Sequence, residues 1–163
     1  MKIGRKSSLH ASQTSKVIDH IYRGGYIRRL QLYPYVKRVF NELQIKYRLA
    51  LISDAQSCYA LPEIQAVGLE NYFESIVISS RYGFRKPDPR LFQKTLDNMQ
   101  LASSEVILVG NDMFRDIYGA QALGIKTIYI DSNQGAKSDK DLTQDYRIQQ
   151  VAVLLQRFTP LAS

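Results

Sequence analysis

The sequence predicts an α/β protein in which a parallel β-sheet carries helices on both faces, a three-layer arrangement. Two observations lead to this prediction. Short apolar runs of strand length recur along the chain, and segments with helical spacing of apolar residues separate them. Short buried strands that alternate with helices are typical of parallel sheets, because the crossover helices cover both faces. Ligands of such sheets bind beyond the carboxyl ends of the strands, so residues there are the first candidates for a functional site.

The first half of the sheet is expected between residues 36 and 79. Apolar residues at helical spacing predict a helix over 36–44. The short apolar run RLALI at 48–52 predicts the first strand, and the polar residues 53–57 after it are suited to cap a helix through 60–66. The run IVIS at 76–79 predicts the second strand.

The second half opens with a helix over 89–99. Asp88 is a suitable N-cap, and Pro89 is favourable at the first helical position because its φ angle is already fixed near the helical value. The remaining predicted elements are a strand at 106–109 (VILV), a helix near 116–123, a strand at 127–130 (TIYI) and a terminal amphipathic helix at 149–158.

Composition limits the class of protein. The 163 residues suit about one domain with a real core. The single cysteine, Cys58, excludes an intramolecular disulfide and suits a reducing compartment. No apolar run approaches the ~18 residues of a membrane span, and the N-terminus has no apolar signal-peptide core. We therefore expect a cytoplasmic protein with no membrane partner.

The net charge of +7 is unevenly distributed. Residues 1–48 contain eleven Lys and Arg residues against two acidic ones, a net charge of +9, whereas residues 49–163 carry −2. Such asymmetry can indicate affinity for nucleic acid. Residues 1–48 contain no recognition motif and no interleaved aromatic platform, so a solvated basic face is favoured and a nucleic-acid partner is not expected.

Ser53 and Asp54 follow the first predicted strand. Either side chain is suited to cap the next helix, because Ser and Asp at an N-cap accept otherwise unpaired backbone N–H bonds. A hydroxyl group beside a helix N-terminus is also suited to bind an anion. For these two residues taken alone, capping is the favoured interpretation.

Lys86 opens the tetrapeptide KPDP after the second predicted strand. Each proline fixes its own φ, and the residue before a proline is pushed toward an extended conformation, so this tetrapeptide should be stiff. An isolated lysine here would be an ordinary loop residue. On a rigid base at the carboxyl end of a strand, however, an ammonium group is placed to bind phosphate or carboxylate.

Asp112 and Asp116 follow the third predicted strand and are spaced to lie on one helix face. As a structural pair they repel by about 0.2–0.5 kcal/mol, which a helix N-terminus offsets by about 0.3–1 kcal/mol, with Asp112 as a cap. As a metal site they need few partners, because Mg²⁺ commonly binds only one or two protein carboxylates and completes its shell with water and substrate oxygens.

Together, a serine after one strand, the lysine of KPDP after the next and the DxxxD pair after a third resemble the haloacid dehalogenase-like superfamily of hydrolases. The resemblance runs from about residue 32 to the C-terminus. Residues that connect the motifs also agree with it: Leu32-Tyr33-Pro34, Gly68-Leu69, Gly119-Ala120 and Leu123-Gly124.

The resemblance implies a Rossmann-like core over 32–163 and a Mg²⁺-dependent phosphatase that acts on a small phosphate monoester through an aspartyl-phosphate. It implies that Ser53, Asp54 and Lys86 bind the phosphoryl group, with Lys86 and Ser53 acting in catalysis. It further implies that Asp112 and Asp116 help to hold Mg²⁺.

The sequence departs from this family at two places. The family's nucleophile is an aspartate in a DxD motif at the end of an N-terminal strand, and the only D-x-D here is Asp139–Asp141, in a late polar stretch. We therefore expect the central first strand and most of the cap to be missing, with 1–31 a basic tail and the remnant of a helical cap. Asn111 stands where many relatives have the first acidic residue, which either weakens the Mg²⁺ site or leaves the metal to Asp112.

Three interpretations follow. The chain is the C-terminal part of a hydrolase whose nucleophile lies elsewhere, or a catalytically dead relative that binds or assembles, or a nucleic-acid-associated protein. Loss of a covalent nucleophile has cost a well-studied hydrolase about 10⁶-fold in rate, so little activity is expected from this chain alone. The gap in the sheet is expected to close by pairing of the flanking strands, or to be filled by residues 1–31 or by another subunit of a homo-oligomer.

Overall fold

The computed structural model describes residues 30–131 and 143–158. Almost all of the predicted tail and cap remnant at 1–31 lies outside the described residues. The description below concerns the compact unit Tyr33–Ser163. Within the described residues, no helix is long and apolar enough to cross a membrane.

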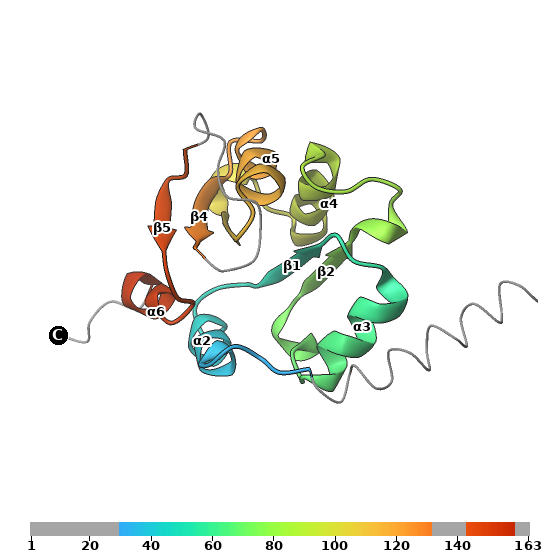
Figure 1. The fold of residues 1–163 in the computed structure, drawn as a ribbon. Coiled ribbons are helices and arrows are strands. Elements are labelled where there is room, and N and C mark those ends of the chain that lie inside the picture. The colour runs from blue at the N-terminus through green and yellow to red at the C-terminus, as the bar shows by residue number, and fades with distance from the viewer. Residues whose placement is uncertain (1–29, 132–142, 159–163) are drawn as a thin grey trace, which may run out of the picture. The chain divides into compact units, whose positions relative to one another are not determined.

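The described strands form two parallel sheets (Figure 1). In the first sheet β1 pairs with β2, from Ala50 opposite Ser75 to Ser53 opposite Ile78. The second sheet has the order β3-β4-β5, and both of its pairings are parallel. The strands are β1 (Ala50–Ser53), β2 (Ser75–Ile78), β3 (Ile107–Gly110), β4 (Lys126–Ile130) and β5 (Tyr146–Ile148).

The helices connect these strands in the order that the sequence predicts. They are α2 (Val36–Leu43), α3 (Ser57–Ala66), α4 (Pro89–Met99), the short α5 (Gly119–Gln121) and α6 (Val153–Phe158). A π-helical segment, η4 (Met113–Tyr118), stands directly before α5, and three 3₁₀ turns complete the chain: η1 (Glu70–Tyr72), η2 (Ser79–Arg81) and η3 (Ser103–Glu105).

Helices cover both faces of the β3-β4-β5 sheet. On one face Ile128 of β4 packs with Val39 of α2 and Leu154 of α6, and α2 lies beside α6 (Figure 1). The next residue of β4, Tyr129, packs with Ile117 of η4 on the opposite face, because successive side chains of a strand alternate between faces. The predicted three-layer α/β class is therefore confirmed.

A further core cluster joins α4 to α5. Phe92 and Leu96 of α4 pack with Ala120 of α5 and with Ile125, which precedes β4. The helix α4 begins and ends at the predicted residues, since Asp88 and Pro89 define its start locally. Its left-handed C-cap residue, Gln100, ends it.

Two predicted elements were wrong in extent. The terminal helix begins at Val153 rather than at 149, and the preceding strand β5 was not predicted. β5 is only three residues long and two of these are exposed, so it lacks the apolar run by which the other strands were found. The helix predicted at 116–123 begins at Met113 as a π-helix, because Asp112 accepts hydrogen bonds from the backbone N–H groups at its start.

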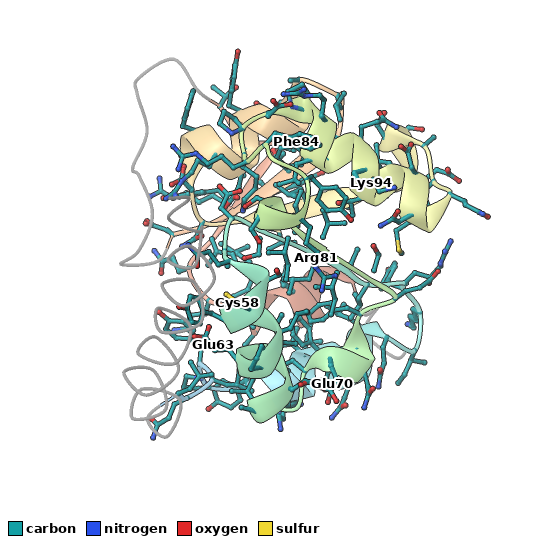
Figure 2. The ribbon with its side chains drawn as sticks, turned by 90° about the vertical axis from the view of Figure 1, so that its right-hand side faces the viewer. Cys58, Glu63, Glu70, Arg81, Phe84 and Lys94 are labelled. Atoms are coloured by element: carbon teal, nitrogen blue, oxygen red, sulfur yellow. The ribbon has the colours of Figure 1, made fainter. Side chains whose placement is uncertain are left out.

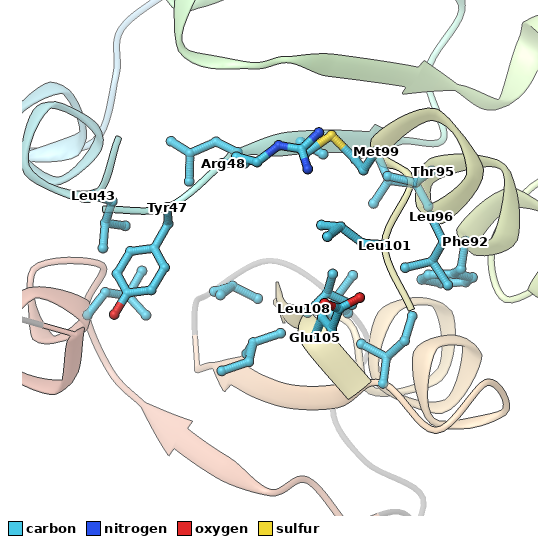
Figure 3. A pocket seen from close by; sticks show the side chains of 18 of the residues that line it. Leu43, Tyr47, Arg48, Phe92, Thr95, Leu96, Met99, Leu101, Glu105 and Leu108 are labelled. Atoms are coloured by element: carbon cyan, nitrogen blue, oxygen red, sulfur yellow. The ribbon is translucent and has the colours of Figure 1, made fainter. Parts of the chain in front are cut away.

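Of the three expected ways to close the gap in the sheet, direct pairing of the flanking strands does not occur among the described residues. Among the described residues, β1 pairs only with β2, and β3 pairs only with β4. A cavity of ≈ 470 Å³, lined by residues of both β1 and β3, lies between the two sheets. Side chains from the α4 side, among them Phe92, Leu96 and Leu101, also line it (Figure 3).

Candidate active site at the carboxyl ends of β1 and β3

Ser53 is the last residue of β1, and Asp54 follows it directly. The carboxylate Oδ1 of Asp54 accepts a hydrogen bond of 2.9 Å from the backbone N–H of Lys86. This bond ties the KPDP loop to the end of β1. The capping interpretation for Ser53 and Asp54 is wrong, because α3 begins at Ser57, whose backbone N–H donates instead to Ser80 Oγ. Cys58, in the first turn of α3, is exposed (Figure 2).

The predicted cap of α4 is confirmed on the other side of Lys86. Asp88 accepts the backbone N–H of Arg90 at 3.0 Å, with Pro89 at the first helical position. The Arg90 guanidinium also forms an ion pair with Asp88 at 2.6 Å. These hydrogen bonds from Arg90, with the side chain's contribution the largest, lower the pKa of Asp88 to about 2.

Aromatic rings precede Lys86 on this loop. The Arg90 guanidinium lies 4.6 Å above the centre of the Phe84 ring, and this ring stacks against Tyr82 at 6.0 Å between centroids. Figure 2 shows Phe84 close to α4. On the far side of Lys86, a Cβ atom at Gly119 would lie 2.6 Å from the Phe92 ring and 3.0 Å from Pro87 Cα. The loop is therefore packed against both α4 and α5.

Lys86 reaches from this loop to Asp116 of η4. Its Nζ donates to Asp116 Oδ1 at 2.5 Å, and the two side chains are only 13% and 8% exposed. The other oxygen of Asp116, Oδ2, accepts the backbone N–H groups of Asn111 and Asp112, each at 3.1 Å. Asp116 thus joins the loop after β2 to the end of β3.

Gly110, the last residue of β3, makes this approach sterically possible. A Cβ atom at this position would lie 2.4 Å from Asp116 Cβ and 2.7 Å from its Oδ2, distances that real atoms do not adopt. Only glycine leaves the space that the Asp116 side chain occupies.

Asp112 is buried and held mainly by Arg115. Its Oδ1 accepts the backbone N–H groups of Phe114 and Arg115, and its Oδ2 accepts Arg115 Nε at 2.8 Å and pairs with Nη2 at 2.7 Å. The hydrogen bond to Asp112 raises the pKa of the Arg115 guanidinium, and the charges of Asp112, Asp54 and Asp116 raise it further. All three carboxylates therefore stabilise the charged form of Arg115.

The structure brings the sequence-predicted residues to one edge of the fold. Asp54 contacts Lys86, and Lys86 contacts Asp116. The negative charges of Asp112, Asp54 and Asp116 all act on the Arg115 guanidinium. Asp54 Oδ2 is buried and has no hydrogen-bond partner among the described residues. The roles of Ser53, Asp54 and Lys86 toward a substrate, and of Asp112 and Asp116 toward a metal, stay predictions.

Sequence reasoning missed two members of this cluster. Arg115 stands three residues after Asp112, a spacing at which helix side chains meet. The sequence could therefore have predicted the ion pair between them. Nothing in the sequence singles out Gly110. Its close contact depends on where η4 lies against β3, which no local pattern reveals.

A divalent cation fits this donor set only in part. Two carboxylates are enough in number for Mg²⁺. In the described structure, however, Asp116 is engaged by Lys86 and Asp112 by Arg115. No group of three or more His, Cys, Asp or Glu side chains placed to hold a metal occurs in the described part of the chain. By themselves, these residues do not form a complete metal site.

Comparison with known proteins points to one family. The family model described as haloacid dehalogenase-like hydrolase matches residues 3–130. A glyceraldehyde 3-phosphate phosphatase of Pyrococcus abyssi is 30% identical over 112 residues, which are 68% of this chain and 46% of that protein. A phosphoserine phosphatase of Thermus thermophilus is 29% identical over 122 residues, which are 74% of this chain and 49% of that protein.

A solved structure agrees with these matches in fold. The crystal structure of a phosphatase of the same family from Thermococcus onnurineus superposes with a TM-score of 0.75 at 23% identity, covering 84% of this chain and 62% of that one. The chain spans about half the length of the two curated relatives named above.

Proposed function

This chain belongs to the haloacid dehalogenase-like hydrolases, and on that premise we propose that it supplies the phosphate-binding side of a phosphatase site. The observation that carries the proposal is the contact between Lys86 and Asp116, at the edge where β1 ends at Ser53 and Asp54 follows. A largely buried ammonium group held on a packed loop is a preorganised positive charge, of the kind that stabilises phosphoryl transfer.

The proposed role of Lys86 requires that a phosphoryl oxygen take the position now filled by Asp116 Oδ1. The hydroxyl group of Ser53 would bind a second phosphoryl oxygen from the end of β1. The nucleophile would be an aspartate from outside the described residues, because Asp112 and Asp116 are held in place by backbone N–H groups and protein cations. We therefore propose that the chain alone turns over little or no substrate.

The proposed substrate class is a small phosphate monoester. The curated relatives' names include a triose phosphate and a phosphorylated amino acid, which supports the class and leaves the choice within it open. Mg²⁺ dependence is proposed for the completed site only. The bound cation would neutralise phosphate charge there, and the chain alone is expected to bind Mg²⁺ weakly or not at all.

The test is hydrolysis of p-nitrophenyl phosphate with Mg²⁺ by this chain joined to an N-terminal segment that carries a DxD strand. We expect phosphate release that falls by about 10²-fold or more in Lys86→Ala, the size of effect seen when one preorganised donor is removed. Full turnover in Lys86→Ala would refute the assignment. An exposed lysine, Lys46, provides the matched control, and Lys46→Ala should retain activity.

A second candidate function is that of a binding or assembly module. The cavity between β1 and β3 favours it, because both strands leave an edge without a described partner there. A DxD fusion that folds and binds Mg²⁺ but releases no phosphate would support this alternative.

A further inference from the structure

A second hollow lies beside the candidate active site, at the carboxyl end of β2. It has a volume of ≈ 290 Å³ and is lined by Ser79, Ser80, Gly83, Phe84 and Arg85. Ser53, the last residue of β1, pairs with Ile78 of β2, so the next residue of the chain, Ser79, stands just past the end of β1. Neighbouring strands lie about 4.8 Å apart. The hollow therefore begins about one strand spacing from the hydroxyl group that we propose as a phosphate ligand.

The backbone of the loop after β2 is shaped to accept an anion. Tyr82 has φ −120° and ψ −9°, near the right-handed region, and Gly83 has a left-handed φ of +76°. Such a succession turns neighbouring backbone N–H groups toward one concave side, where anions bind. Within residues 30–131 and 143–158, the N–H groups of Gly83, Phe84 and Arg85 have no hydrogen-bond acceptor. The loop thus offers consecutive backbone donors to a ligand.

The charge of the same loop is positive. Residues 79–90 contain four Arg and Lys residues and one acidic residue, Asp88, a net charge of +3. Lys86 and Arg90 each have a carboxylate partner. Arg85 is exposed, lines the hollow and forms no ion pair with any other described residue. Its guanidinium is therefore a cation that an anionic ligand in the hollow can reach.

Two hydroxyl groups and an aromatic ring complete the lining. Ser79 is 8% exposed, and its Oγ has no hydrogen-bond partner among the described residues. Ser80 Oγ accepts the Ser57 N–H at 2.9 Å, which leaves the O–H of Ser80 as a donor. The Phe84 ring is held by Arg90, whose guanidinium lies 4.6 Å from the ring centre. The hollow thus combines polar donors with a wall that is fixed by packing.

Structural needs account for the rest of this loop but not for Arg85. Gly83 permits the turn, and Asp54 holds the backbone N–H of Lys86. Asp88 caps α4. None of these contacts requires a cation next to unpaired backbone donors.

We propose that this hollow is an anion subsite, which binds a second charged group of the substrate, either a carboxylate or a second phosphate. The inference rests on the proposed phosphatase function and narrows its substrate class to phosphate monoesters with an acidic group at their other end. A guanidinium group binds either anion through two parallel N–H donors. In an extended chain with two carbons between them, a phosphate ester and a carboxyl group lie about 5 Å apart, which matches the spacing of β1 and β2.

The test is titration of the ¹⁵N-labelled chain with three probes, followed by NMR at low ionic strength, where exposed ion pairs are least screened. Propyl phosphate has one anionic group, 2-carboxyethyl phosphate adds a carboxylate, and propane-1,3-diyl bisphosphate adds a second phosphate. We expect the two dianionic-end probes to bind about threefold or more tighter than propyl phosphate, the size that one exposed charge pair contributes. They should shift the backbone amides of Gly83 and Phe84 and the Nε of Arg85. The tighter of the two identifies the second group.

Protein variants locate the subsite. Arg85→Gln should reduce the affinity for both longer probes to that for propyl phosphate and leave propyl phosphate binding unchanged. The position is exposed, so the fold should survive, as circular dichroism will verify. Arg81→Gln is the matched control, because Arg81 is an exposed arginine of the same loop outside the lining. An equal loss in both variants would show that only the net charge of the loop matters, and would overturn the subsite.

The remaining outcomes separate this proposal from the proposed function. Equal affinity for all three probes, with shifts confined to Ser53, Asp54 and Lys86, would overturn the subsite and leave the phosphate site at Lys86 in place. Shifts confined to residues 79–85 with every probe would keep an anion site at Arg85 and refute the phosphate-binding role of Lys86. No shift at residues 79–85 with any probe up to about 50 mM would overturn the subsite.

Discussion

The ammonium group of Lys86 lies 2.5 Å from a carboxylate oxygen of Asp116, and both side chains are almost fully removed from solvent. The two residues are thirty positions apart in the sequence and come from different loops. Their contact joins the loop after β2 to the segment after β3, and thus links the two described sheets. It therefore matters for stability as well as for the proposed chemistry.

Lys86→Met should destabilise the chain by about 3 kcal/mol, because it leaves a buried carboxylate without its counter-charge. Urea unfolding followed by circular dichroism measures this. The control is Lys46→Met, an exposed position where a change within about 0.5 kcal/mol is expected. The double variant Lys86→Met with Asp116→Asn should recover part of the loss, and strict additivity would show that the two side chains do not interact.

Gly110→Ala should lower the free energy of unfolding by about 1–3 kcal/mol. The added Cβ would overlap Asp116 and force that side chain away from Lys86. Gly83→Ala is a useful comparison. Nothing lies within 4 Å of a Cβ at Gly83, but the φ of +76° at Gly83 is unfavourable for alanine. The Gly83→Ala variant therefore measures the cost of backbone strain without a steric clash. We expect only the Gly110 variant to lose coupling with Lys86→Met in a double-mutant cycle. Coupling that stays at wild-type strength would contradict this explanation.

The pKa of Asp88, lowered to about 2 from 3.8, predicts a pH-dependent contribution to stability. A carboxylate with a lowered pKa in the folded state binds protons more readily when unfolded. Its contribution is therefore complete above about pH 4 and is lost as the pH falls through about 2. Asp88→Asn keeps a good helix cap but removes the charge.

The difference in unfolding midpoint between wild type and Asp88→Asn should be constant above pH 4 and shrink toward pH 2. A series of urea melts over this range measures it. Asp97→Asn, an exposed change in the same helix, is the control. A difference that grows as the pH falls would have the wrong sign for this explanation.

Arg115→Gln should increase the affinity of the chain for divalent cations, because it releases Asp112 Oδ2 from its guanidinium partner. Isothermal titration with Mg²⁺, with Tb³⁺ luminescence as a second probe, measures the change. Arg147→Gln on β5 removes a more exposed ion pair, with Asp131 after β4, and serves as control. Equal affinity in both variants would show that Arg115 does not compete with a metal.

Local signals made much of the fold predictable. The helix α4 was predicted to the residue, because Asp88 and Pro89 specify its start through short-range hydrogen bonding and a fixed φ. The strands β1 to β4 were found within two residues from their apolar runs. β5 was missed because Tyr146 and Arg147 are exposed, so its burial pattern carries no strand signal.

The positions of the candidate residues at strand ends were predictable, but the contacts among them were not. The order of Ser53, Lys86 and Asp116 along the chain indicated one edge of a sheet. That Lys86 would pair with Asp116, and that Asp54 would hold the KPDP backbone rather than cap α3, depends on how loops from three strands pack. Such tertiary distances are not encoded in any short stretch of sequence.

The half-exposed side chains of Ile107 and Val109 also bear on how the protein behaves in a concentrated solution. An uncovered strand edge flanked by apolar groups is a template on which other chains can polymerise. Because no described strand pairs with this edge of β3, we expect the chain to aggregate as its concentration rises.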